Sequence, residues 1–154
     1  ELQNCDLGSL WREAWHNLEL ARRDKEIAFR ELNPDVDDVC QIDPFALGQV
    51  FRNILENAIV ACPEEGEIEV RLRATKLANE REAVEVSFRD NGPGLSAEAR
   101  ESIFEPFFTT RTKGTGLGMA IAKRIVDAHA GKIIAESHEE GGAQISIILP
   151  AATA

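Results

Sequence analysis

Strict alternation of apolar and charged residues over 66–74 and 83–90 constrains this chain more than any other feature. Side chains along a β-strand point to opposite faces in turn, so each stretch predicts a strand with one apolar and one charged face. The apolar positions are Ile68, Val70, Leu72, Val84, Val86 and Phe88. The polar residues between the two stretches predict a hairpin loop. Such strands need a covering layer of helices on one face.

Helical spacing and weaker alternation predict the remaining elements. The expected helices span 7–24, 44–62, 96–103 and 117–130. The expected further strands span 27–32, its candidate partner 39–42, 132–137 and 143–149. Asp43 and Pro44 form a helix start, because Asp caps free N–H groups and Pro suits the first turn. We therefore expect a single α+β domain over 1–154, a sheet covered by helices on one side.

The composition excludes several classes of function. The 154 residues are 44% hydrophobic and 29% charged, which suits one soluble domain with a full core. No apolar run is long enough to cross a bilayer, and no secretory leader is present in this sequence. Seventeen Lys and Arg against 27 Asp and Glu give a net charge of -10, which argues against a nucleic-acid ligand. Backbone N–H groups and a metal ion can still hold a small phosphate ligand.

The helix over 44–62 carries Asn53, Glu56 and Asn57 on the flank opposite its apolar stripe. A step of four places the two asparagines one turn apart on the same face. Amide oxygens are hard, neutral ligands of the kind that Mg²⁺ accepts beside phosphate oxygens and water. A solvated helix face is the alternative reading of this pattern.

The sequence Asp90-Asn-Gly-Pro-Gly94 ends a strand. Strand parity places Asp90 on the same face as Val86 and Phe88, which predicts an inward carboxylate. Such a carboxylate is costly unless a donor such as the exocyclic amino group of a purine reaches it. The glycines would let the backbone approach a flat ring closely. An ordinary Asn-Gly turn is the alternative, but it does not explain the inward Asp.

The sequence Gly114-Thr-Gly-Leu-Gly118 opens the helix over 117–130. Glycines before a helix N-terminus expose N–H donors that suit an anion. The run is not a Walker loop, and the preceding Phe-Phe-Thr-Thr-Arg-Thr-Lys is not the strand that a dinucleotide fold requires. The aromatic stretch 104–110 lies just before it, so we expect a loop anchored by Phe side chains that acts as a lid. A plain connector and simple core filling are the alternatives.

In order and spacing, these four segments resemble the catalytic, ATP-binding domain of bacterial sensor histidine kinases, in the wider GHKL family of gyrase, mismatch-repair and chaperone ATPases. The resemblance covers residues 40–150, and the stretch 107–118 is most similar to kinases of the nitrogen-regulation type. It implies a Bergerat-type α/β sandwich: a mixed, mostly antiparallel sheet of about five strands, about three helices on one face and an ATP lid over 104–117. It also implies ATP and Mg²⁺ as ligands.

The resemblance assigns roles to single residues. Glu56 and Asn57 are the implied catalytic residues, Glu56 as base or orienting group and Asn57 as the Mg²⁺ ligand. Asp90 would accept from the adenine amino group, and Asn53 would contact the phosphates or the ion's water shell. The implied nucleotide-binding positions are Asn53, Asn57, Asp90, Gly92, Gly94, Thr110, Arg111, Lys113, Gly114, Thr115, Gly116, Leu117 and Gly118.

Some positions depart from the family pattern. Ala143 stands where the family often has a Thr near the adenine, and Val60 stands where some relatives carry a phosphate-facing Lys. The change at Val60 shifts phosphate contact toward the lid, where Arg111 and Lys113 could reach the γ-phosphate. A solvated position on the lid remains the alternative for both side chains.

The phosphoacceptor histidine is missing from this sequence. His16 does not match the acceptor motif of such kinases, so it is expected to be a surface or packing residue. We therefore expect a piece of a longer protein, with residues 1–25 as a helix continuing from an absent dimerisation and phosphoacceptor domain. The expected partners are that domain and, downstream, a response regulator, with no nucleic acid and no membrane contact. We expect a monomeric, cytoplasmic fragment whose parent can be attached to the inner membrane.

The resulting hypothesis is transfer of the γ-phosphoryl group of Mg²⁺·ATP to a histidine on a separate domain. An ATPase that drives a conformational cycle is a second hypothesis. It needs a Glu one turn before Asn57 to activate water, and that position is Asn53, whose amide cannot act as a base. A non-catalytic nucleotide-binding module is a third.

Overall fold

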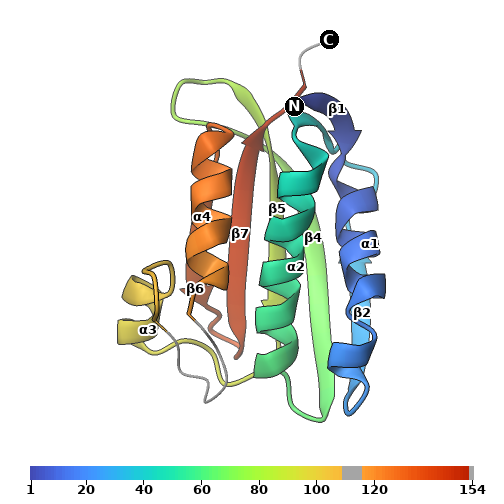
Figure 1. The fold of residues 1–154 in the computed structure, drawn as a ribbon, viewed down its shortest axis with the longest axis vertical. Helices are drawn as coiled ribbons and strands as arrows, with labels where there is room; N and C mark the ends of the chain where they lie inside the picture. The colour runs from blue at the N-terminus through green and yellow to red at the C-terminus, as the bar shows by residue number, and fades with distance from the viewer. Residues whose placement is uncertain (109–115, 153–154) are drawn as a thin grey trace.

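A five-stranded sheet under a layer of helices forms most of the fold in this computed structural model, which describes residues 1–108 and 116–152. The strands are β1 (Gln3–Asp6), β2 (Glu26–Leu32), β3 (Val39–Ile42), β4 (Glu65–Lys76), β5 (Glu82–Asp90), β6 (Lys132–Ser137) and β7 (Ala143–Pro150). The helices are α1 (Leu7–Asn17), the 3₁₀ helix η1 (Leu20–Arg22), α2 (Pro44–Ala61), α3 (Ala97–Ser102) and α4 (Gly118–Ala128). Helices α1, α2 and α4 lie side by side on one face (Figure 1).

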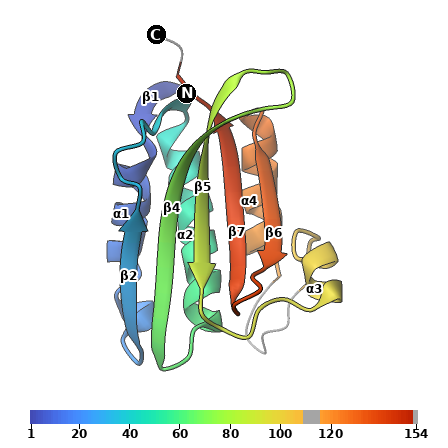
Figure 2. The same cartoon turned by 180° about the vertical axis from the view of Figure 1, so that it is seen from behind.

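The large sheet has the strand order β2-β4-β5-β7-β6. Only β2 and β4 are parallel; the other neighbouring pairs are antiparallel. Seen from behind, its second face is not covered by any helix of the described ranges (Figure 2). The expected α+β sandwich with a mixed, mostly antiparallel sheet is therefore confirmed, and so is the hairpin of β4 and β5.

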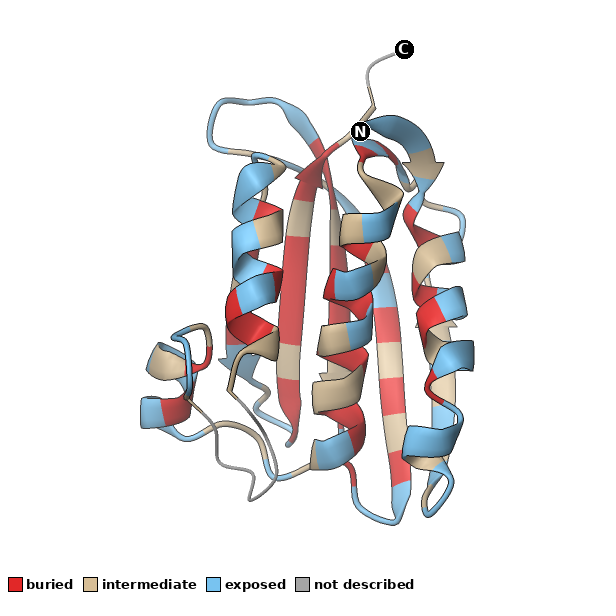
Figure 3. Ribbon diagram, viewed as in Figure 1, coloured by how far each residue is buried: buried red, intermediate tan, exposed pale blue. Residues whose placement is uncertain are grey.

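The core lies between the helices and the sheet. Its centre is an aromatic cluster of Trp11, Phe51 and Phe88, one from each of α1, α2 and β5, with ring centroids 5.6–6.3 Å apart. All three side chains are fully buried. The central strands β5 and β7 are buried along most of their length (Figure 3). Edge-to-face contacts of this kind add to the free energy of simple apolar burial, so they fix the positions of α1 and α2 on the sheet.

The start of α2 follows the sequence prediction closely. The Asp43 side chain accepts hydrogen bonds from the N–H groups of Phe45 and Ala46, and Pro44 occupies the first turn. The apolar stripe of α2 is buried against the sheet; its members are Leu47, Val50, Phe51, Ile54, Leu55, Ala58 and Ile59. The opposite flank of this helix is left free to line a cavity.

The expectation of one helix over residues 1–25 is wrong. The chain begins with strand β1, and α1 starts only at Leu7, where the Asp6 side chain accepts from the N–H of Ser9. Helix α1 ends at Asn17 and is followed by the separate 3₁₀ turn η1. The indole of Trp15 stacks at 4.5 Å on the ring of Phe29, which holds α1 against β2.

The expected pairing of 39–42 with 27–32 is also wrong. Strand β3 pairs instead with β1, in an antiparallel two-stranded sheet apart from the large one. Strand β2 pairs with β4, in parallel. The short polar stretch of β1 carries no alternation strong enough to predict a strand, so its pairing depends on the distant β3.

None of the described helices is long and apolar enough to cross a membrane.

Replacing Phe88 by Ala should lower the free energy of unfolding by about 3–5 kcal/mol, because the cavity left among Trp11 and Phe51 cannot close fully. Urea denaturation followed by circular dichroism measures this change. The control is Phe45→Ala, since the Phe45 ring is 87% exposed and its loss should cost less than about 0.5 kcal/mol. Equal losses for the two variants would contradict the placement of the core.

Candidate functional site

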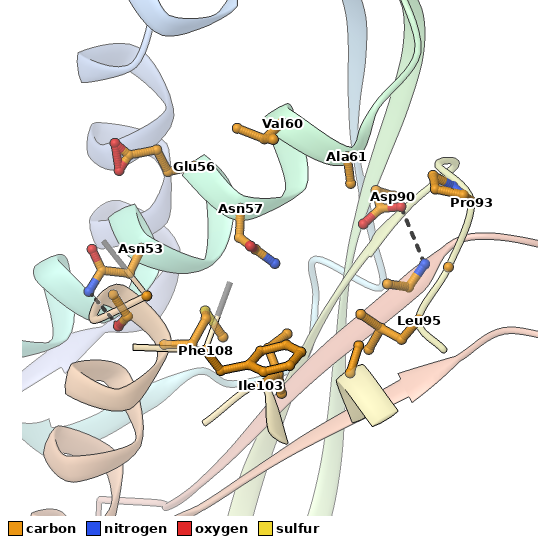
Figure 4. Close-up of a pocket in the computed structure, with 16 residues that line it drawn as sticks. Asn53, Glu56, Asn57, Val60, Ala61, Asp90, Pro93, Leu95, Ile103 and Phe108 are labelled. Atoms are coloured by element: carbon orange, nitrogen blue, oxygen red, sulfur yellow. Dashed lines mark hydrogen bonds between the residues drawn. The ribbon is translucent and has the colours of Figure 1, made fainter. Parts of the chain in front are cut away.

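A cavity of about 530 Å³ opens between α2, the loop after β5, α3 and the start of α4. Its lining residues are Asn53, Glu56, Asn57, Val60, Ala61, Asp90, Pro93, Gly94, Leu95, Ala99, Ile103, Phe108, Gly116, Gly118, Met119 and Ala143. The sequence predicts several of these residues at one site, and the fold brings them together from segments up to 90 residues apart, Asn53 to Ala143. Figure 4 shows Asn57 of α2 facing an apolar wall that includes Leu95, Ile103 and Phe108.

The polar flank of α2 contributes Asn53, Glu56 and Asn57, each half-buried. The Nδ2 of Asn53 donates to the carbonyl oxygen of Gly118 at 2.9 Å, which ties α2 to the first residue of α4. This bond orients the amide, because its nitrogen is engaged and its Oδ1 is left as an acceptor. Asn57 points into the cavity, whereas Glu56 extends from another edge of the helix (Figure 4).

Asp90 ends β5 and is only 4% exposed. Its Oδ1 accepts from the N–H of Gly92 at 2.8 Å and from the N–H of Ala143 at 3.3 Å. Burial raises the pKa of the Asp90 carboxyl above its ordinary value, while these two N–H groups and the charge of Arg89 lower it in part. Within the described residues, Oδ2 accepts no hydrogen bond. The inward carboxylate expected from strand parity is therefore present.

The loop after Asp90 is held by close backbone contacts. A Cβ on Gly92 would lie 2.2 Å from the carbonyl oxygen of Ala61, so only glycine fits against the end of α2. At the other end of the loop, the Oγ of Ser137 accepts from the N–H of Leu95 at 2.7 Å and donates to its carbonyl at 2.8 Å. Sequence reasoning missed Ser137, because nothing near it in the sequence indicates a partner on another strand.

The start of α4 forms the far end of the cavity. Gly116 has φ +74°, and a Cβ there would lie 2.4 Å from the backbone of Phe107. The first residue of the helix is Gly118, and the preceding Leu117 has no side-chain acceptor to cap its N–H groups. The N–H groups at a helix N-terminus favour an anion. The predicted lid residues Thr110, Arg111, Lys113, Gly114 and Thr115 lie outside the described residues.

The aromatic stretch before the lid behaves differently at each position. Phe104 packs against the core and Phe108 lines the cavity, as expected of anchoring residues. The Phe107 ring, in contrast, is 75% exposed, so the expectation that it anchors the loop by burial is wrong. Its backbone contributes instead, because its N–H donates to the carbonyl of Gly116 at 2.8 Å. The two positions that depart from the family pattern, Val60 and Ala143, both line the cavity.

The family described as "Histidine kinase-, DNA gyrase B-, and HSP90-like ATPase" matches residues 42–153. The chain belongs to this family. Sensor histidine kinase ZraS of Escherichia coli K12 is 38% identical over 97% of this chain and 31% of its own length. Sensory histidine kinase/phosphatase NtrB of Salmonella typhimurium is 38% identical over 79% of the chain and 36% of its own length, which agrees with the resemblance to nitrogen-regulation kinases. The chain thus spans about a third of these curated relatives.

Solved structures lead to the same family. The catalytic domain of histidine kinase ThkA superposes with a TM-score of 0.84 at 34% identity, covering 97% of this chain and 95% of that one. Full-length ShkA, solved in complex with AMPPNP, gives a TM-score of 0.80 at 28% identity, over all of this chain and 32% of that one. The chain therefore has the fold of a sensor-kinase catalytic domain.

Replacing Asp90 by Asn should stabilise the chain at neutral pH, since Asn keeps the Oδ1 acceptor without a buried charge. The carboxyl has a higher pKa when folded than the ordinary 3.8, so the folded state holds the proton to higher pH. The parent should therefore lose stability relative to the variant as pH rises from 3.8 through the raised pKa. Melting temperatures of both chains between acid and neutral pH measure the difference. A difference between the two chains that shrinks with rising pH would contradict the burial of Asp90.

Proposed function

We propose that this domain binds Mg²⁺·ATP in the cavity and presents the γ-phosphoryl group to a histidine on a separate helical domain. The observation that carries the proposal is the buried Asp90 carboxylate, which lines the cavity and whose Oδ2 accepts no hydrogen bond from the described residues. An acceptor in such a place needs a donor. The exocyclic amino group of adenine supplies one, whereas guanine has an oxygen at that ring position.

The opposite end of the cavity suits the phosphates. The N-terminus of α4, with Gly118 and Met119 lining the cavity, offers backbone N–H groups and the positive end of the helix dipole. We infer that Gly114, Gly116, Leu117 and Gly118 serve this end, with Arg111 and Lys113 from the lid. This anion site requires no surplus of basic residues, which reconciles phosphate binding with a net charge of -10.

Magnesium fits the donor set at this cavity. Over residues 1–108 and 116–152, no group of three His, Cys, Asp or Glu side chains could hold a metal ion without other ligands. An ion here would take the amide oxygen of Asn57, with Asn53 beside it and the remaining ligands from phosphate and water. When bound, Mg²⁺ would neutralise charge on the phosphates during transfer.

The catalytic contribution of the chain is mainly positioning. The buried carboxylate of Asp90 binds the adenine base. The amide of Asn53, through its bond to Gly118, fixes the position of α4 relative to α2. Glu56, on the flank of α2 beside Asn57, is the group that orients the incoming histidine or accepts its proton. In-line transfer would follow from this alignment of donor and acceptor.

Membership of the family supports the expected partners. The chain would act on a dimerisation and phosphoacceptor domain, and a response regulator would accept the phosphoryl group next. The fragment itself would be a cytoplasmic monomer, one domain over 1–154 with residues 104–117 as the lid. Strand β1, in place of the expected continuous helix, would then form its connection to that partner domain.

Asn57→Ala should weaken binding of a non-hydrolysable ATP analogue about tenfold or more in Mg²⁺ and remove most of the Mg²⁺ dependence, because the metal loses its protein ligand. Calorimetric titration with and without Mg²⁺ measures both effects. Gln49→Ala is the matched control, since Gln49 lies on the same helix outside this cavity. Unchanged affinity in Asn57→Ala would place the metal elsewhere.

Glu56→Gln should leave nucleotide affinity within about twofold and slow phosphoryl transfer at least about tenfold, because Gln cannot accept a proton. The assay supplies a separate acceptor domain and follows its histidine phosphorylation. Rapid ATP hydrolysis without that acceptor would support the ATPase hypothesis. Nucleotide binding without transfer would support a non-catalytic module.

A further inference from the structure

Lys25, between η1 and β2, holds the carboxyl end of α2. Its Nζ donates to the carbonyl oxygens of Ile59 at 2.8 Å, Val60 at 3.2 Å and Cys62 at 2.7 Å. The last carbonyls of a helix lack partners within the helix, and a lysine ammonium has three N–H donors. Lys25 makes no ion pair among the described residues, so these carbonyls are its partners. Its positive charge also lies at the negative end of the helix dipole.

The same helix end forms part of the cavity wall. Val60 and Ala61 line the cavity, and the carbonyl oxygen of Ala61 is the atom against which the backbone of Gly92 is packed. The pKa of the Cys62 thiol reflects the same proximity: burial and the charge of Asp90 raise it, whereas the charge of Lys25 is among the influences that lower it. Lys25 and Asp90 thus both lie near Cys62, at the end of α2.

We propose that Lys25 is a positioning residue for the base end of the cavity, which is the end that contains Asp90 and would hold the adenine base. It fixes the last turn of α2, that turn fixes Gly92, and Gly92 in turn donates to the Asp90 carboxylate. Loss of the ammonium removes the Lys25 donor from all three carbonyls, of which Ile59 keeps a bond from the Cys62 N–H, so the last turn loosens and the Asp90 loop loses its support. The inference rests on the proposed function, because it assigns Lys25 to the recognition of adenine.

The test compares Lys25→Met with the parent chain, using calorimetric titration of a non-hydrolysable ATP analogue and of the corresponding GTP analogue in Mg²⁺. At a temperature where both chains are fully folded, Lys25→Met should bind the ATP analogue about tenfold more weakly and lose much of its preference over GTP, since small displacements in a site cost at least this much. Lys25→Arg keeps a cation with several donors and should recover most of the affinity.

A matched control separates positioning from general stability. Leu149→Ala removes a fully buried side chain that does not line the cavity, and it should lower the melting temperature while keeping the affinity and preference of the parent. If Lys25→Met does not fold, Lys25→Gln, which keeps a shorter donor, takes its place with the same expected direction.

Two results would overturn the inference, and they differ. If the parent binds the ATP analogue and the folded Lys25 variant binds it within about twofold with the same preference, Lys25 does not position the base end. If Leu149→Ala loses affinity in step with its melting temperature, the effect at Lys25 is one of stability alone. Absence of binding by the parent would instead overturn the proposed function itself.

Discussion

Asp90, at the end of β5, is the one charged residue that is buried within residues 1–108 and 116–152, and the elements around it compensate part of the cost of burying a carboxylate. Asp90 retains its place because two backbone N–H groups, from Gly92 and Ala143, compensate part of the loss of water. Those donors come from the following loop and from the neighbouring strand β7. The position of α2 is equally important for holding Asp90 in place, because the end of α2 packs directly on the loop that contains Gly92.

Much of the fold and part of the site could be predicted from the sequence because their signals are local. Period-two alternation predicts β4, β5 and the inward face of Asp90, and the cap at Asp43 predicts the start of α2. The glycine-rich segments likewise indicate close backbone approach, and Gly92 shows it against Ala61.

The remainder depends on contacts between distant segments. Strand β1 has only four residues, mostly polar, so its pairing with β3 is determined by tertiary contacts rather than by its own pattern. The ammonium of Lys25 and the hydroxyl of Ser137 act on backbone groups more than 30 residues away, with no spacing rule to reveal them. The exposed ring of Phe107 shows that an aromatic run alone does not indicate which member is buried.

The abrupt start of α1 has a mechanical consequence. The first N–H groups of this helix are satisfied by Asp6 and Asp38, so the helix terminates sharply at Leu7 and extended chain precedes it. A neighbouring domain joined through this extended segment could displace β1 from its pairing with β3. It could not rotate α1 directly, as a domain joined through a continuous helix would.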